Sequence, residues 1–353
     1  ATTTDPLTEE DRVWGMIQGL ANSYDDPYTS FLPPQENEMF AEEISGEFGG
    51  VGMEVGRQDG ILTVITPLKG TPAEAAGLHA GDLIIAIDNE PTEGMSVDQA
   101  VRLIRGEIGT DVVLKIARKG TNELVDITVT RDAIKIPTSS ATLRDDGIFV
   151  IELYNFGATS PAEFRRALAD FKLSRSDKLI IDLRGNPGGF LEASIEVASW
   201  FLPLGKVVVQ EHYSDGTDDV VHRSKGYDLH EDDWKVVVLI NRGSASASEI
   251  VAGALSEHEI ATLIGTRTFG KGSVQELVDV TSDTALKVTI ARWLTPLGHT
   301  ISKNGLEPDI EVEMTPEDVR EGRDPQLEKA VEFLLNGGVL EESSPEETLP
   351  EEA

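Results

Sequence analysis

Apolar residues along the chain form continuous runs and spaced stripes, and the two patterns predict different elements. Continuous apolar runs rich in β-branched residues are typical of strands buried on both faces of a parallel sheet. Strands of this kind are predicted at residues 148–153, 178–183 and 236–240. Helices are predicted at residues 161–173, 190–202 and 249–255. Buried strands that alternate with helices indicate an α/β core.

Amphipathic helices are predicted near both ends of the chain. Residues 8–24 have acidic residues in their first turn and an apolar stripe at helical spacing. The stripe consists of Trp14, Ile17, Leu20 and Ala21. It packs either on the chain's own core or against a second subunit. Residues 324–335 form a second amphipathic helix, which we expect to close the fold.

Residues 48–118, between the first helix and the core, alternate short predicted strands and helices after a glycine-rich loop. A glycine-rich loop at residues 48–52 leads into an alternating, strand-like segment. Further on, a short helix, an apolar run, a helix and a strand are predicted at residues 72–78, 80–88, 96–104 and 111–118. Gly50 and Gly52 lack the third glycine of a dinucleotide-binding fingerprint, so this loop is a weak sign of a nucleotide site.

The length and composition predict several domains and an acidic tail. A chain of 353 residues is long for one core. We predict an N-terminal helical segment at residues 1–45, a second domain at 46–131, a core at 132–336 and a tail at 337–353. Residues 341–353 hold six glutamates, two prolines and no basic residue, so we expect them to be disordered.

Charge and residue counts exclude several classes of function. A formal net charge of −33 argues against a nucleic acid or an anionic membrane as partner, because both would repel the chain. The chain has no cysteine, which excludes disulfides and thiolate metal sites. Its six histidines are scattered and form no metal-binding motif. We therefore expect neither a metal nor a cofactor.

No apolar run reaches the roughly 18–20 residues that a membrane-spanning helix needs. No signal peptide is recognisable, and the sequence begins at Ala1 without a methionine. We expect a processed N-terminus from which any export signal or anchor has been removed.

The first candidate for chemistry is Ser246, in a turn of small residues between a predicted strand and a predicted helix. A hydroxyl there lies at the positive end of the helix, beside unpaired N–H groups that can stabilise an oxyanion. Ser246 and Glu249 also fit the S-x-x-E capping box, which is a purely structural role. The turn by itself favours the structural role of Ser246 as a helix cap over a catalytic role.

Lys271 shifts the interpretation of Ser246 from a helix cap towards a catalytic residue. Glycines on both sides of Lys271 allow the backbone to approach closely. Burial would lower the pKa of its amine, by up to ~3–5 units in extreme cases, and a neutral lysine can take a proton from a serine. In a strand, Gln275 would lie on the same face and could orient the lysine. Gly265 to Lys271 nearly matches a phosphate-binding loop, but Gly272 replaces the required Ser or Thr and the next residues alternate like a strand.

On these residues the chain resembles the carboxyl-terminal processing peptidases, serine endopeptidases that carry a PDZ domain and use a Ser–Lys dyad. Most of the chain is covered. The shared motifs are residues 25–32 (DDPYTSFL), 182–189 (DLRGNPGG) and 305–309 (GLEPD), a PDZ-like segment, and the surroundings of Ser246 and Lys271. The resemblance implies a crotonase-like α/β core with an inserted PDZ domain and an extracytoplasmic location. It makes Ser246 the nucleophile, Lys271 the general base and Gln275 the residue that positions the lysine.

The resemblance also assigns the remaining site residues. It places an oxyanion hole at the glycine turn, where Gly188 or Gly189 would act with the N–H of Ala247; simple turn chemistry explains these glycines as well. A PDZ domain captures the C-terminal carboxylate of a peptide on loop N–H groups. That loop consists here of Phe48, Gly49, Gly50, Val51 and Gly52. Arg105 matches a family arginine tied to substrate sensing, or forms a surface ion pair.

Two functions of different classes fit the PDZ-like segment. One is an endopeptidase whose PDZ domain recruits proteins or peptides with free C-termini and delivers them to Ser246 and Lys271. In an alternative form of this hypothesis, the PDZ domain also gates the site. The other is a catalytically silent peptide-binding scaffold. The hydroxyl, amine and amide retained together at Ser246, Lys271 and Gln275 favour the enzyme. A homodimer through the terminal helices is a further expectation.

Overall fold

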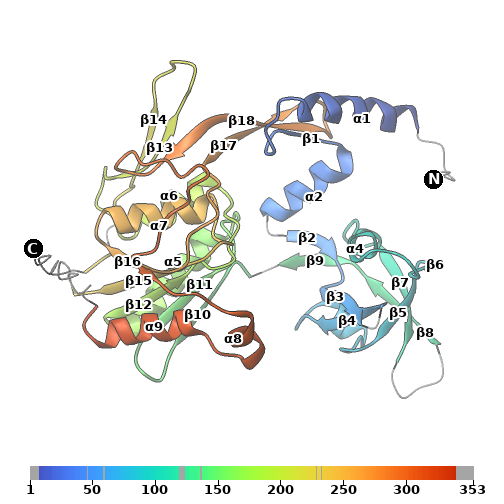
Figure 1. Cartoon of the computed structure of the whole chain (residues 1–353). Helices are drawn as coiled ribbons and strands as arrows, with labels where there is room; N and C mark the ends of the chain where they lie inside the picture. Colours follow the sequence, from blue (N-terminus) through green and yellow to red (C-terminus); the bar gives the residue numbers. More distant parts are fainter. Residues whose placement is uncertain are drawn as a thin grey trace, which may run out of the picture. The chain divides into compact units, whose positions relative to one another are not determined.

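The computed structural model describes residues 8–45, 47–58, 60–118, 124–135, 137–227, 229–231 and 233–338. The chain divides into two compact units (Figure 1). The smaller unit spans Glu38–Pro137, and the larger unit contains Ala1–Asn37 and Thr138–Ala353. The predicted disordered residues 341–353 lie outside the described part of the chain.

The larger unit is built on a six-stranded sheet in the order β10-β11-β12-β15-β16-β19. Its strands are β10 (Ser139–Leu143), β11 (Phe149–Leu153), β12 (Lys178–Asp182), β15 (Lys235–Ile240), β16 (Ala261–Gly265) and β19 (Ile310–Glu311). Only β10 runs antiparallel to its neighbour, while all the other pairs are parallel. The predicted buried strands therefore form the centre of a largely parallel sheet.

Helices cover both faces of this sheet, because successive strand residues point to opposite sides. One face packs against α5 (Ser160–Ser174), α6 (Leu191–Ser199) and α7 (Ala247–Glu257) through residues such as Leu179, Ile181 and Val238. The other face, which includes Ile180 and Val237, packs against α9 (Pro325–Leu335). Figure 1 shows α9 on the side of the sheet opposite to α6 and α7. The short α8 (Pro316–Glu321) precedes α9.

A second sheet of the larger unit has the order β1-β18-β13-β14, and β17 also pairs with β18. Its strands are β1 (Ser30–Leu32), β13 (Val207–His212), β14 (Val220–Arg223), β17 (Ser273–Asp279) and β18 (Ala285–Leu294). The N-terminal helix α1 (Glu9–Asn22) leads into β1. Because β1 pairs with β18, the start of the chain joins the same sheet as the segment after Lys271.

The smaller unit is mostly strand. Its main sheet has the order β3-β4-β5-β7-β8, with β6 on β5, and β2 pairs with β9. The strands are β2 (Glu47–Gly50), β3 (Met53–Gln58), β4 (Ile61–Pro67), β5 (Leu83–Ile87), β6 (Glu90–Pro91), β7 (Asp111–Ala117), β8 (Leu124–Thr130) and β9 (Asp132–Lys135). Helices α3 (Pro72–Ala75) and α4 (Val97–Ile104) belong to it as well, and α2 (Pro34–Ser45) spans the boundary between the units.

The smaller unit has its own apolar core and an ion pair whose carboxylate is buried. Val64, Ile84 and Leu114 are among its fully buried residues. Arg118 holds the Asp82 carboxylate through two hydrogen bonds of 2.7 Å. Burial opposes the charge on Asp82, but the hydrogen bonds and charge of Arg118 outweigh it, so the pKa of Asp82 is lowered.

The observed elements follow the hydrophobic pattern closely, with shifts at their ends. The helix predicted at residues 190–202 begins at Leu191 and ends at Ser199, and the one at 72–78 ends at Ala75. Within the described ranges, no helix is both long and apolar enough to cross a membrane.

Candidate active site

The candidate site lies at the carboxyl ends of β11, β12 and β15. These strands are parallel neighbours, so the turns that follow them meet at one edge of the sheet. The turn after β12 contains Gly188 and Gly189, and the turn after β15 contains Ser246. Sheet topology thus brings the two predicted catalytic turns together.

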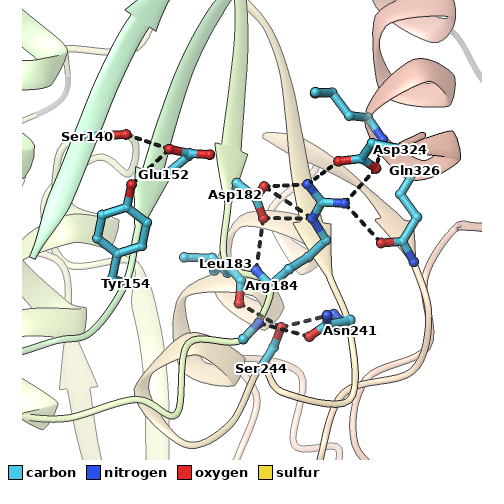
Figure 2. Close-up of polar contacts among 12 residues, drawn as sticks. Ser140, Glu152, Tyr154, Asp182, Leu183, Arg184, Asn241, Ser244, Asp324 and Gln326 are labelled. Carbon is cyan, nitrogen blue, oxygen red and sulfur yellow. Dashed lines mark hydrogen bonds and ion pairs between the residues drawn. The ribbon is translucent and has the colours of Figure 1, made fainter. Parts of the chain in front are cut away.

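Side chains at the base of the two turns fasten them to each other. The Ser244 hydroxyl donates to the carbonyl of Leu183 at 2.8 Å. The Asn241 side-chain oxygen accepts the N–H of Gly185 at 2.9 Å, and Figure 2 shows Asn241, Ser244 and Leu183 around this junction. Ser244 is fully buried, so its bond to Leu183 is shielded from water, whereas the Asn241 bond lies at the surface.

Asn186 is a further residue that fixes the turns, and no sequence pattern singled it out. Its side chain is fully buried and donates to the carbonyl of Leu153 at 2.6 Å. Its own carbonyl accepts the Ala245 N–H at 3.0 Å and the Ser248 hydroxyl at 2.9 Å. One asparagine therefore joins the ends of β11, β12 and β15.

Gly188 lies directly against the Ser246 turn. Its φ is +100°, and a Cβ atom placed on it would approach Ser246 Cβ to 2.8 Å and Ala247 N to 2.9 Å. A side chain at this position would collide with the turn, so glycine is required for the close approach. The structure thus brings together Gly188, Ser246 and Ala247, three of the predicted site residues.

The main-chain N–H groups at this edge differ in their availability. The Gly188 N–H donates to the side-chain oxygen of Asn186 at 2.9 Å. Gly189 forms a parallel bridge with Phe156 in which its own N–H points away from the partner. The Ala247 N–H lies at the start of α7, where no helical acceptor exists. Neither the Gly189 nor the Ala247 N–H has a hydrogen-bond acceptor within the described residues.

Ser246 has a strained backbone. Its φ of 55° and ψ of −116° lie outside the common regions for a residue other than glycine. Such strain clusters at functional sites, and a sharp strand-to-helix turn is one way to expose a serine hydroxyl. Ser246 is partly exposed, whereas Ala245 and Ala247 on either side are buried.

Glu249 connects the Ser246 turn to the Lys271 segment. Its side chain is fully buried in α7. Oε2 accepts the N–H of Ser246 at 2.8 Å and the N–H of Lys271 at 3.0 Å. Oε1 accepts the hydroxyl of Thr268 at 2.6 Å and the N–H of Gly270 at 2.7 Å.

Burial and the four hydrogen-bond donors act in opposite directions on the pKa of Glu249, and burial is the larger effect. Burial raises the pKa of Glu249, and the hydrogen bonds from Thr268, Gly270, Ser246 and Lys271 oppose that rise. Every contact is a donor to the carboxyl group, so the arrangement is complete only for the ionised form. In the predicted capping box, the bond from the Ser246 N–H to the Glu249 side chain is present. The same carboxylate also accepts the Lys271 N–H and so holds the lysine segment.

Lys271 is half-buried and lies two residues before β17. Its Nζ is 5.7 Å from the centre of the Tyr28 ring. Gln275, in β17, donates from its amide to the Tyr28 carbonyl at 3.4 Å. The element after Lys271 is a strand, which excludes the phosphate-binding loop, since that loop needs a helix there.

The predicted peptide-binding residues form a groove within the smaller unit. Its volume is about 160 Å³, and its lining is mostly apolar. The lining residues are Phe48, Gly50, Val51, Gly52, Met53, Val55, Val101, Ile104 and Arg105. The Arg105 guanidinium lies 4.0 Å above the centre of the Phe48 ring. Gly49 is not part of the lining; its carbonyl accepts the Gly106 N–H at 3.2 Å.

No cluster of His, Cys, Asp and Glu suited to a metal ion occurs in the described part of the chain. The candidate site thus consists of a serine, a lysine, an amide and main-chain N–H groups.

Comparisons with known proteins match both units. Residues 147–312 match Peptidase family S41, and residues 63–118 match a PDZ domain. A carboxy-terminal processing protease of Bacillus subtilis, CtpA, is 37% identical over 87% of this chain and 65% of its own length. A carboxy-terminal-processing protease of Bartonella bacilliformis is 37% identical over 90% of this chain and 72% of its own.

A solved structure agrees with these sequence matches. The photosystem II D1 C-terminal processing protease superposes with a TM-score of 0.56 and 28% sequence identity, covering 94% of this chain and 88% of its own. The chain therefore shares its arrangement of elements with a known C-terminal processing protease.

Proposed function

Because the chain belongs to the carboxy-terminal processing proteases, serine peptidases of family S41, we propose that Ser246 is its nucleophile and Lys271 its general base. The Glu249 contacts are the observation that carries this assignment. One carboxylate oxygen accepts the main-chain N–H of both residues, so the nucleophile and the base are attached to the same rigid point. A catalytically silent scaffold has no need of this connection or of the strained Ser246 backbone.

The proposed reaction begins when the neutral Lys271 amine takes the proton of the Ser246 hydroxyl. The Ser246 Oγ then bonds to the carbonyl carbon of the substrate, and the resulting oxyanion accepts hydrogen bonds from the N–H groups of Gly189 and Ala247. The Lys271 ammonium returns its proton to the leaving amine as the peptide bond breaks. A water molecule, deprotonated by Lys271, hydrolyses the acyl-enzyme and regenerates both groups. Gln275 is proposed to help position the lysine.

The PDZ domain is proposed to recognise the C-terminus of the substrate. An apolar groove next to loop N–H groups suits an apolar terminal residue with a free carboxylate. Arg105 lies at this groove and supplies a positive charge. Unfolded proteins or proteins with an exposed tail are the substrates that fit such recognition.

This proposal predicts that a substrate with a free C-terminal carboxylate is cleaved better than the same peptide as its amide. Loss of a charge-assisted hydrogen bond costs roughly 1.5–3 kcal/mol, which is about tenfold or more in affinity. Initial rates on a matched pair of long peptides with apolar ends measure the difference, and Ser246→Ala is the inactive control. Equal KM values for acid and amide would refute carboxylate capture.

Three finer features are part of the proposal. The larger unit is assigned the crotonase-like fold that the family resemblance implies. An extracytoplasmic location follows from the same resemblance. A homodimer through α1 is supported by its exposed apolar residues Met16 and Leu20, which are 68% and 66% exposed, while Ala21 alone is buried.

A further inference from the structure

The turn between α1 and β1 reaches the candidate site although it is distant in sequence. Within this turn the Asp26 carboxylate accepts the Tyr28 N–H at 3.2 Å and the Thr29 hydroxyl at 2.6 Å. These bonds close a compact loop, a common conformation for an aspartate followed by proline. The loop fixes the direction in which Tyr28 points.

Strand pairing anchors this turn to the sheet that carries the lysine segment. Ser30, Phe31 and Leu32 of β1 pair with β18, and the Phe31 side chain is only 2% exposed. The Thr289 N–H of β18 donates to the Thr29 hydroxyl at 3.2 Å. The turn is therefore held on both sides of Tyr28, by Asp26 before it and by β1 after it.

Tyr28 lies next to Lys271, the proposed base, and next to Gln275, which is proposed to position that base. Its carbonyl accepts the Gln275 amide at 3.4 Å, and its ring centre is 5.7 Å from Lys271 Nζ. A cation within about 6 Å of an aromatic face is attracted by the negative potential of the ring. Tyr28 itself is half-buried, so part of this attraction acts away from bulk water.

We propose that Tyr28 is a positioning residue for Lys271, and that the turn at residues 25–29 is thereby a component of the active site. The inference rests on the proposed role of Lys271 as general base. The ring limits where the amine can lie, and the main-chain carbonyl holds the Gln275 side chain that is proposed to act on the same lysine. Tyr28 takes no part in bond making.

The contact has a defined effect on the pH–rate profile. An aromatic face stabilises the ammonium form over the neutral amine, so removing the ring favours the neutral form. Cation–π energies convert to a shift of about 0.4–1.5 pH units towards lower pH in the midpoint of the profile. Charged groups near the segment include Glu249 on the Lys271 N–H, Asp26 on the Tyr28 N–H, Arg292 opposite Ser273 and Lys303 beside Gly270. All four are unchanged in the Tyr28 variants.

The test compares kcat of the full chain with Tyr28→Leu and Tyr28→Phe, on a short peptide, across the pH range in which the rate rises. Tyr28→Leu is expected to shift the midpoint to lower pH by the amount given above and to lower the plateau by up to about 100-fold, since misplacement of the base by an ångström has that effect. Tyr28→Phe keeps the ring and restores the wild-type midpoint. Tyr24→Leu, at a tyrosine 75% exposed at the end of α1, is the matched control.

The outcomes separate this inference from the dyad itself. A wild-type rate that does not rise with pH would overturn the role of Lys271. A wild-type rate that does rise, with coincident midpoints for Tyr28→Leu and Tyr28→Phe, would overturn only the role of Tyr28. If Tyr28→Leu does not fold, a fluorinated phenylalanine at position 28 gives the same test, because it keeps the ring shape and removes the negative potential of its face. An unshifted midpoint there also overturns the inference.

Discussion

The Glu249 carboxylate is the point at which the Ser246 turn and the Lys271 segment meet. This one carboxylate accepts hydrogen bonds from four donors, which would otherwise each need an acceptor of their own. A buried donor that loses its acceptor costs about 1–3 kcal/mol, so each of these contacts resists displacement of the segment it holds. At the scale of single residues, Glu249 therefore holds in place the two segments that carry the proposed dyad.

Glu249→Gln is predicted to impair both stability and catalysis. The glutamine amide would turn an N–H₂ group either towards the N–H groups of Ser246 and Lys271 or towards the Thr268 hydroxyl and the Gly270 N–H, so at least one N–H donor would be left unpaired. We expect the free energy of unfolding to fall by roughly 2 kcal/mol or more. We expect kcat to fall by about 10–100-fold with a smaller change in KM, because the substitution misplaces the reacting groups.

Urea denaturation and steady-state kinetics measure the two effects. Glu257→Gln is the matched control, since Glu257 lies at the other end of α7 and accepts hydrogen bonds from Thr295 and Leu297. It is expected to lose stability without a comparable loss of kcat. Wild-type kcat in Glu249→Gln would show that the bridge does not position the dyad.

The sequence could predict only part of this arrangement. The spacing of Ser246 and Glu249 identified the helix cap, because a cap is a local interaction. The donors from Thr268 and Gly270 come from another segment, so spacing carried no information about them. Likewise Tyr28 and Gln275 are 247 positions apart, and no local pattern could place them together.

At the scale of elements, the Arg184 cluster connects the turn after β12 to the start of α9. Arg184 makes hydrogen bonds with both oxygens of Asp182 and both oxygens of Asp324, as Figure 2 shows. Gln326 accepts a further bond from the same guanidinium at 3.2 Å. Asp324 is also the N-cap of α9. The cluster thus fixes the helix that covers the second face of the sheet.

Asp324→Asn is predicted to destabilise the larger unit at neutral pH by about 1.5–3 kcal/mol, the range for hydrogen bonds to charged groups. Burial opposes the charge on Asp324, but the hydrogen bonds and charge of Arg184 prevail, so its pKa is lowered from 3.8. A carboxyl group whose pKa is lowered by folding stabilises the fold above its unfolded pKa. This contribution is lost as the pH falls below 3.8 and through the folded pKa.

Thermal unfolding of the wild type and of Asp324→Asn as a function of pH tests the prediction. The difference between them should be constant near neutral pH and should shrink on acidification below 3.8. Glu328→Gln, at an exposed position of α9, is the control and should behave like the wild type. A difference that persists unchanged at low pH would mean that the ionised carboxylate is not the source of the stability.

The hydrophobic pattern identified the central elements, because their burial requires apolar residues at regular positions in the sequence. The runs of β-branched residues at β12 and β15 and the amphipathic α9 are read directly from the sequence. Strands at the margins, such as β14 and β10, are short and partly exposed, so they carry little apolar signal. The pairing of β1 with β18 depends on tertiary contacts and could not be predicted.

At the scale of the whole molecule, the PDZ groove and the Ser246 site belong to separate compact units. This separation fits a proposed division of labour in which one unit recognises a chain end and the other cleaves the chain. The family motifs in the sequence covered both units.

Ser246 and Lys271 are proposed to perform the cleavage together. The most direct measurement is cleavage of a denatured protein by the full chain carrying Ser246→Ala or Lys271→Ala, followed on gels, with circular dichroism to verify folding. Each variant is predicted to lose activity by several orders of magnitude while keeping its fold, because nucleophile and base act as a unit. Ser256→Ala on the same helix and Lys303→Ala on an exposed turn are the matched controls and should stay active. Substantial cleavage by folded Ser246→Ala or Lys271→Ala would contradict the account.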